Sequence, residues 1–303
     1  MDLRGRRLIV TGASAGIGFA ATQQLVARGA HVTMAVRDEQ KAAAACASAR
    51  LEMKNVTIQK LDLTDRLSIE AFAEEASKND IHVLINNAGV LQQSGPTFIH
   101  GMESTLLTNH IGPAYLTQLL LPALHKTREK CLHAQHSVRI VNVGSRLEKN
   151  GKLDFHSTPF LQLIKNGATS EQPFGGWSEY SNSKNMNLLW TNALQRRNPQ
   201  IVINTVTPGM VNTELSRNSP WWLLYLTYPL RALLLRSPAQ GADAIVHAAV
   251  SPEVTSGGVF RADKGVVIRH SRENNTAEEE SARMRTEEMI EYWQRRVATR
   301  LFA

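Results

Sequence analysis

The chain has 303 residues, of which 43% are hydrophobic and 20% charged, and its net charge is +7. These values exclude a mainly disordered chain, and the length suits one large α/β domain or two small ones. A mild positive charge fits nucleic acid, an anionic membrane surface or a phosphorylated small molecule. The sequence has no long Lys/Arg run that would favour the first two, so charge alone does not choose among them.

The cysteines and the apolar stretches indicate the kind of cellular compartment in which the protein resides. Cys46 and Cys131 have no paired-motif spacing, which excludes a disulfide scaffold and favours a reducing compartment. The charged segment Met1–Arg7 leads directly into a strand and leaves no room for a secretory signal. Trp221–Leu235 is the most hydrophobic stretch, and at 15 residues it is too short for an ordinary membrane span but can lie on a membrane surface.

Short apolar or β-branched runs alternate with helical patterns along most of the chain, which predicts an α/β fold with a parallel sheet and helices on both faces. The predicted strands are Arg7–Thr11, His31–Val36, Val56–Leu61, Ile81–Asn86, Val138–Val143, Ile201–Val206 and Gly258–Arg261. The predicted helices are Ile17–Arg28, Asp38–Glu52, Asp65–Ser77, Met102–Lys130 with a break at Gly112–Pro113, Tyr180–Arg196 and Ala239–Val250.

Two segments interrupt this alternation, and a charged tail follows it. Residues 146–179 form a long insert and residues 213–237 an apolar, aromatic segment, and both follow strands, where open α/β sheets build ligand sites. The tail over 271–303 carries apolar residues at helical spacing, which predicts a final helix docked by Trp293 or, as the alternative, a partner-binding helix. Its apolar positions are Ile290, Trp293, Val297 and Leu301.

A glycine-rich turn joins the first predicted strand to the first helix. Its sequence, Thr11-Gly-Ala-Ser-Ala-Gly-Ile-Gly18, includes Ser14 between the first two glycines. Gly12 permits a tight turn, Gly16 lets the backbone approach a pyrophosphate, and Gly18 lets the helix pack closely on the sheet. We therefore predict a dinucleotide-binding turn.

The end of the second strand indicates which dinucleotide binds. An NAD site has a carboxylate there to hold the ribose 2′-hydroxyl, whereas this chain has Val36 and Arg37. The guanidinium of Arg37 can pair with a 2′-phosphate, which favours NADP(H) over NAD(H). Asp38 is interpreted as the N-cap of the next helix.

With these motifs in place, the chain resembles the short-chain dehydrogenase/reductase family over roughly residues 7 to 262. The matching motifs are TGASAGIG (11–18), LDL (61–63), NNAG (86–89), Asn109, Ser145, Tyr180-Ser-Asn-Ser-Lys184 and Pro208-Gly209. Within the family the likeness is closest to the retinol dehydrogenases, through AVRD (35–38), NHIGPAYLTQLLLPAL (109–124), PGMVNTEL (208–215) and SPEVTSGGVF (251–260). The resemblance implies a single doubly wound Rossmann domain with seven parallel strands in the order 3-2-1-4-5-6-7.

The resemblance also implies a catalytic set of Asn109, Ser145, Tyr180 and Lys184. Lys184 lies four residues after Tyr180, hence on the same helix face, and its charge together with a nicotinamide ring should lower the pKa of the phenol. Ser145 can polarise a carbonyl, although Val-Gly-Ser-Arg departs from the two serines common in the family. Asn109 resembles the residue that holds a water and links the lysine to solvent.

Further cofactor contacts follow from the same resemblance. Asp62 and Leu63 resemble the adenine-binding pair, although Asp62 can instead be a helix cap. The others are Ile17 at the pyrophosphate, Asn87 and Gly89 beside a ribose, Pro208, Gly209 and Thr213 at the nicotinamide amide, and Tyr180 and Lys184 themselves.

Together these observations predict an NADP(H)-dependent oxidoreductase that interconverts a carbonyl and an alcohol on a lipophilic ketone, aldehyde, retinoid or steroid. The alternatives are a carbon–carbon double-bond reductase and a non-catalytic NADPH-binding scaffold. The expected apolar wall comprises Leu147, Phe174, Trp177 and Trp221–Leu235. We expect no nucleic acid partner, and contact with a membrane surface stays open. Members of the family commonly form homo-oligomers, and the resemblance implies one here, paired through the helices near 102–130 and 180–197. No metal site is expected, because His133 and His136 have no third ligand nearby.

Overall fold

The computed structural model describes residues 1–92, 95–131, 138–155, 157–165, 176–209, 211, 235–263, 266–270 and 276–301. Several sequence predictions therefore lie outside the described residues, among them those on Thr213, Phe174, His133, His136 and the stretch 221–234. Among the described helices, none combines the length and apolar character that crossing a bilayer would need. The described residues likewise contain no group of three or more His, Cys, Asp or Glu side chains placed to hold a metal ion.

A single eight-stranded sheet forms the centre of the molecule, in the order β10-β9-β8-β7-β4-β1-β2-β3. Its strands are β1 (Arg7–Thr11), β2 (His31–Val36), β3 (Val56–Lys60), β4 (Val83–Asn86), β7 (Arg139–Val143), β8 (Val202–Thr207), β9 (Val259–Asp263) and β10 (Val266–His270). The first seven pair in parallel, which confirms the predicted seven-stranded order. The eighth strand, β10, was not predicted; it pairs antiparallel with β9 and ends the sheet.

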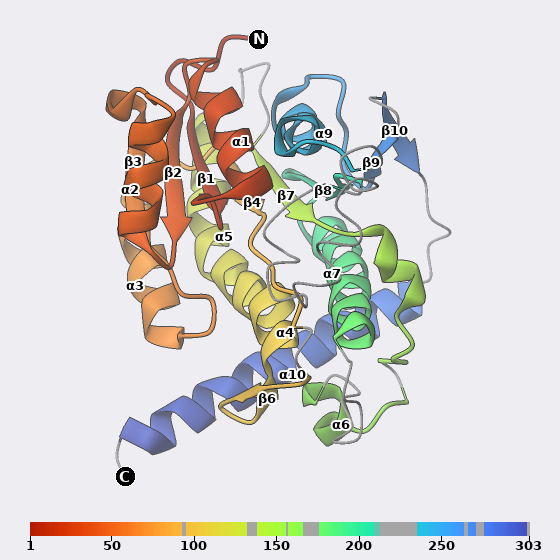
Figure 1. Ribbon diagram of the computed structural model, residues 1–303. Coiled ribbons are helices and arrows are strands. Elements are labelled where there is room, and N and C mark those ends of the chain that lie inside the picture. The colour runs from red at the N-terminus through yellow and green to blue at the C-terminus, as the bar shows by residue number, and fades with distance from the viewer. Residues whose placement is uncertain are drawn as a thin grey trace.

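Helices cover both faces of the sheet (Figure 1). The first face carries α1 (Gly16–Val26), α2 (Glu39–Ser48) and α9 (Pro238–Val250). The second carries α3 (Arg66–Ala76), α4 (Ser104–Leu106), α5 (Gly112–Lys130) and α7 (Trp177–Arg197). Short elements complete the described part: the 3₁₀ turns η1 (Met53–Asn55) and η3 (Arg146–Asn150), the hairpin β5 (Phe98–Ile99) and β6 (Met102–Glu103), and α6 (Phe160–Ile164). Each face thus has its own apolar core.

The predicted helix from Met102 to Lys130 is confirmed from Ser104 onward and is wrong at Met102 and Glu103. Met102 belongs to strand β6, and Glu103 caps α4 by accepting hydrogen bonds from the backbone N–H groups of Thr105 and Leu106. A π-helical turn, η2 (Leu107–Ile111), then leads into α5. The predicted break at Gly112 is wrong, because Gly112 has helical dihedral angles and η2 continues directly into α5. Glycine is needed there for close packing, since a Cβ atom would lie 2.2 Å from the carbonyl oxygen of Leu63.

The tail forms a helix, α10 (Thr276–Leu301), that runs across the second face beside α7 (Figure 1). Trp293 is fully buried in the core, which confirms the predicted docking of this helix. Glu279, also buried, forms an ion pair with Arg196 of α7. Because α10 contacts α7, it covers part of a helix that the resemblance assigned to subunit pairing, and the homo-oligomer stays a prediction.

Candidate active site

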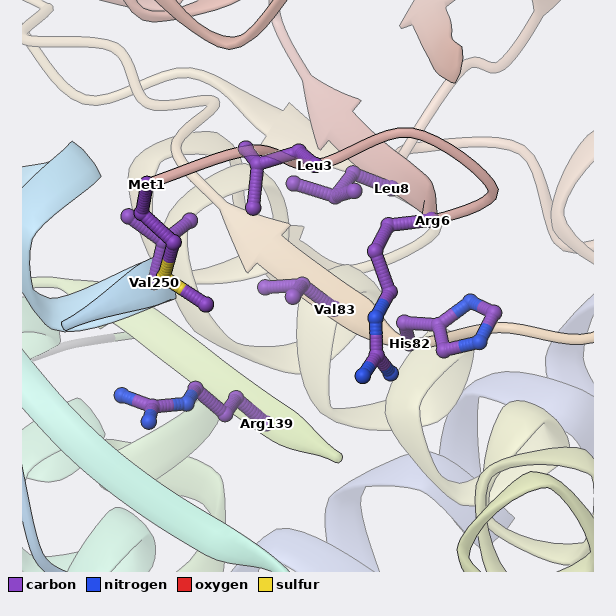
Figure 2. Close-up of a pocket in the computed structure, with 9 residues that line it drawn as sticks. Met1, Leu3, Arg6, Leu8, His82, Val83, Arg139 and Val250 are labelled. Atoms are coloured by element: carbon purple, nitrogen blue, oxygen red, sulfur yellow. The ribbon is translucent and has the colours of Figure 1, made fainter. Parts of the chain in front are cut away.

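The pocket in Figure 2 lies at the amino ends of the parallel strands, away from the glycine-rich turn. It is lined by apolar side chains and by Arg6, His82 and Arg139. Arg139 is buried, which lowers its pKa to about 10, and it donates a hydrogen bond to the carbonyl oxygen of Ala248. Open α/β sheets bind ligands at the carboxyl ends of their strands, so this pocket is not the candidate site.

At the carboxyl end of β1, the glycine-rich turn is held against the loop after β4. The hydroxyl of Thr11 accepts hydrogen bonds from the backbone N–H groups of Asn87 and Ala88, both at 3.0 Å. The Asn87 side chain donates back to the Thr11 carbonyl at 2.8 Å. Gly12 has a φ of +64°, and a Cβ atom on it would lie 2.9 Å from the Ala88 Cα atom. Glycine is therefore required here by both conformation and space.

The start of α1 is suited to an anion. Ala15 precedes the helix and forms no side-chain cap, so the first N–H groups of α1 are not taken by a capping side chain. A Cβ atom on Gly18 would lie 2.4 Å from the Asn87 Nδ2 atom, so α1 packs directly on that loop. Ser14, Gly16 and Ile17 are partly exposed along the same turn.

Arg37 is exposed at the carboxyl end of β2, and within the described part of the chain it forms no ion pair. Its neighbour Asp38 caps α2 by accepting a hydrogen bond from the Lys41 backbone N–H at 2.9 Å. The N-cap interpretation of Asp38 is therefore confirmed.

Asp62 and Leu63 follow β3 in the structure. The Asp62 carboxylate accepts hydrogen bonds from the backbone N–H and the hydroxyl of Thr64, at 2.9 and 2.7 Å. The cap of α3 is Asp65, so the alternative interpretation of Asp62 as a helix cap is wrong. Leu63 is buried and packs against Gly112.

Gly89, in the loop that contacts the glycine-rich turn, lies next to two residues of the predicted catalytic set, Asn109 and Lys184. A Cβ atom on Gly89 would lie 3.3 Å from the Asn109 Oδ1 atom and 3.6 Å from the Lys184 Nζ atom. The side chain of Asn109 holds the next residue, Val90, through hydrogen bonds to both its N–H and its carbonyl group, at 2.7 and 2.9 Å. Because glycine has no side chain, the loop after β4 can lie close to Lys184 at this position.

The structure brings Ser145, Tyr180, Lys184 and Asn109 together at the carboxyl ends of β4 and β7. Tyr180 and Lys184 lie one turn apart on α7, and both are buried. The Ser145 hydroxyl, just beyond β7, is close enough to the Tyr180 hydroxyl to lower its pKa. The Lys184 ammonium donates to the Val143 carbonyl at 2.8 Å and lies 5.6 Å from the centre of the Tyr180 ring.

Burial dominates the ionisation of this cluster. It raises the pKa of Tyr180 to about 12, against a smaller lowering by the hydrogen bond from Ser145. It also lowers the pKa of Lys184 to about 8. The expectation that the Tyr180 pKa falls is therefore wrong for the protein by itself, because removing the phenolate from water outweighs its polar neighbours.

Glu148 belongs to the same cluster and was missed by the sequence analysis. It is buried in η3, three residues after Ser145. Its charge raises the pKa of both Tyr180 and Lys184. A Cβ atom on Gly144 would lie 3.7 Å from the Glu148 Oε2 atom, so the carboxylate faces the end of β7. The signal available in the sequence was an acidic residue one 3₁₀ turn beyond the serine.

The remaining predicted residues border this cluster only in part. Pro208 and Gly209 follow β8, and Gly209 has a φ of +84°. Val211 packs against Gly241, near the start of α9. Gly241 also lies close to the Ile17 side chain. On the other side Trp177, 54% exposed, lies one turn before Tyr180 on α7, and Leu147 is partly buried beside Ser145.

The chain was compared with known proteins. The sequence model of the family described as short chain dehydrogenase matches residues 6–156. Human retinol dehydrogenase 12 is 36% identical over 287 residues, covering 92% of this chain and 84% of that protein. Human retinol dehydrogenase 11 is 34% identical over 273 residues, covering 86% and 78%. The crystal structure of an uncharacterised Mycobacterium paratuberculosis protein is similar with a TM-score of 0.72 and 26% identity, covering 96% of this chain and 95% of that one.

Proposed function

Since this chain belongs to the short-chain dehydrogenase/reductase family, whose members use NAD(P)(H), we propose that it uses NADP(H) to interconvert a carbonyl and an alcohol on a lipophilic molecule. The observation that carries the proposal is the position of Gly89, which brings the dinucleotide-type turn next to Lys184 and Asn109. A phosphate-binding element and a proton-donating cluster thereby share one edge of the sheet.

The residues at this edge fit a dinucleotide. Gly12 and Gly18 leave no space for a Cβ atom, and the uncapped start of α1 offers N–H donors to a pyrophosphate. The exposed guanidinium of Arg37 supports a 2′-phosphate in preference to a free hydroxyl. When bound, the dinucleotide supplies or accepts the hydride.

The chain's own residues handle the oxygen and the proton. Ser145 donates a hydrogen bond to the carbonyl oxygen, and Tyr180 gives its hydroxyl proton to the alkoxide as it forms. The positive charge of Lys184 stabilises the phenolate that Tyr180 leaves behind. Asn109 holds a water that returns a proton from solvent, and its backbone carbonyl accepts a hydrogen bond from the Asn187 side chain.

The pH dependence of carbonyl reduction tests the role of Lys184. We expect the rate to fall as the pH rises through about 8, because the Lys184 ammonium, whose pKa burial lowers to about 8, loses its proton there while Tyr180 stays protonated. The charge of Glu148 holds the Lys184 pKa up, so Glu148→Gln should move this fall to lower pH. Initial rates from pH 6 to 10 for the parent and for Glu148→Gln measure the fall and its shift. The Lys184→Arg variant, which stays charged, should show no fall near pH 8.

The lipophilic substrate is supported by two features. The relatives named above are retinol dehydrogenases, and apolar Trp177 and Leu147 flank Tyr180 and Ser145. The test is NADPH oxidation with a series of aldehydes and ketones of increasing chain length, plus sugars of similar carbonyl reactivity. We expect kcat/KM to rise with apolar size. Equal rates on sugars would contradict the substrate class, and a saturated carbonyl formed from an enone would instead indicate double-bond reduction.

A further inference from the structure

The tail helix α10 is bonded to the centre of the protein by polar as well as apolar contacts. Along the face that meets α7 and η2, Ala282, Thr286 and Met289 are all fully buried. Glu279, one turn earlier, accepts a hydrogen bond from the Asn192 side chain of α7 at 2.8 Å. Thr286 is the polar member of the buried group, so its hydroxyl needs a partner inside the protein.

A chain of hydrogen bonds leads from Thr286 to the candidate active site. The Thr286 hydroxyl lies 2.8 Å from the His110 Nε2 atom, and the His110 Nδ1 atom lies 2.9 Å from the Asn187 Oδ1 atom. Asn187 then donates from Nδ2 to the backbone carbonyl of Asn109 at 2.8 Å. All four residues are buried, so water does not replace these partners.

The direction of each bond follows from its neighbours. Asn187 donates to a carbonyl, which accepts only, so its Oδ1 atom faces His110 and the Nδ1 atom of His110 must carry the proton. Burial lowers the pKa of His110 to about 4, so at neutral pH the ring has one proton and Nε2 is an acceptor. The Thr286 hydroxyl has a single hydrogen and two acceptors within reach, the Ala282 carbonyl oxygen at 2.7 Å and the His110 Nε2 atom at 2.8 Å, and shares that hydrogen between them.

The far end of this chain lies at Lys184. Asn109 donates a hydrogen bond from Nδ2 to the Ser183 hydroxyl at 3.2 Å. A Cβ atom on Gly89 would lie 3.3 Å from the Asn109 Oδ1 atom and 3.6 Å from the Lys184 Nζ atom. Asn109 also lies in the π-helical turn η2, where the backbone is not held by the regular α-helical ladder. The Asn187 side chain adds a hydrogen bond to its carbonyl from outside that turn.

We propose that Thr286 and His110 are positioning residues: acting through Asn187, they fix the backbone carbonyl of Asn109, and α10 thereby supports the catalytic centre. This role rests on the proposed function, in which Asn109 holds the water that resupplies the proton. His110 does not itself transfer a proton, because its one proton is committed to Asn187.

The test compares Thr286→Val, which removes only the hydroxyl, with Thr286→Ser, which keeps it. We expect Thr286→Val to lower kcat for carbonyl reduction about tenfold, the rate equivalent of one buried hydrogen bond, with the KM for NADPH within twofold. Thr286→Ser should stay within twofold of the parent. Met289→Ala, a buried apolar change on the same helix, should lower Tm but leave kcat unchanged.

A second readout does not depend on turnover. Long-range ¹H–¹⁵N spectra of ¹⁵N-histidine-labelled protein should show His110 as the Nδ1–H tautomer, with its Nε2 shift moved in Thr286→Val and retained in Thr286→Ser. An Nε2–H tautomer, or an active parent whose Thr286→Val variant keeps full kcat, would overturn the positioning role. A parent inactive on every carbonyl would overturn the proposed function and this role together, so the two failures are distinguishable.

Discussion

Replacing Tyr180 by Phe is expected to reduce carbonyl turnover about 10³-fold, because it removes the proton donor and leaves the ring in place. Tyr180 is buried on α7, so the substitution deletes one oxygen and leaves the packing intact. NADPH affinity should stay within about twofold of the parent, since the glycine-rich turn is untouched. Turnover is followed by NADPH oxidation, and affinity by calorimetry.

Tyr115→Phe is the matched control for this experiment. Tyr115 is also buried, but its hydroxyl is bonded to Glu70 on α3, away from the site. We expect this variant to lose about 1 kcal/mol of stability with unchanged turnover. If Tyr180→Phe keeps full activity, the proposed mechanism is wrong. If the parent binds NADPH but turns over no carbonyl, the non-catalytic scaffold becomes the better interpretation.

Reversing the charge of Arg37 is expected to reverse the cofactor preference. Arg37→Asp should weaken NADPH binding about 100-fold, because a carboxylate repels the 2′-phosphate that a guanidinium binds. NADH binding should be retained or strengthened, since an acidic residue at the end of this strand can accept the ribose hydroxyl. Arg37 is exposed, so the fold is not expected to change.

Calorimetric titration of the parent and of Arg37→Asp with NADPH and NADH measures this preference. Arg50→Asp serves as the control, because Arg50 is an exposed arginine just beyond the other end of α2, and its φ of 51° is one that Asp tolerates. It should bind both cofactors like the parent, apart from a small change in long-range charge. A parent that prefers NADH would contradict the assignment to Arg37 and leave the family membership intact.

The order of the sheet and most helix positions could be predicted because local rules decide them. Strands β1 and β2 are buried apolar runs between turn signals and appear at their predicted bounds. Asp38 caps α2 because a short acidic side chain before an Ala-rich segment satisfies the first N–H groups wherever that segment lies. The tail helix was predicted in the same way, from the spacing of its apolar residues.

Three features depended on contacts between distant segments. The first two residues of the helix predicted from Met102 instead form strand β6, because they pair with β5, and α4 and a π-helical turn then lead into α5. Strand β10 has no parallel neighbour and exists through its pairing with β9. Glu148 becomes part of the site because the turn after Ser145 folds it inward toward Tyr180 and Lys184.

The sequence by itself therefore determined the family, the parallel sheet and the identity of the residues gathered at its edge, since these follow from residue type and spacing along the chain. Only the tertiary structure decided the pKa values of these residues and the hydrogen bonds that connect them to distant parts of the chain. Burial, which no single residue specifies, raises the pKa of Tyr180 and lowers that of Lys184. Folding also brings Thr286 within 2.8 Å of His110, 176 residues away in sequence. Desolvation and hydrogen bonding act through space, so neither is readable from the local pattern.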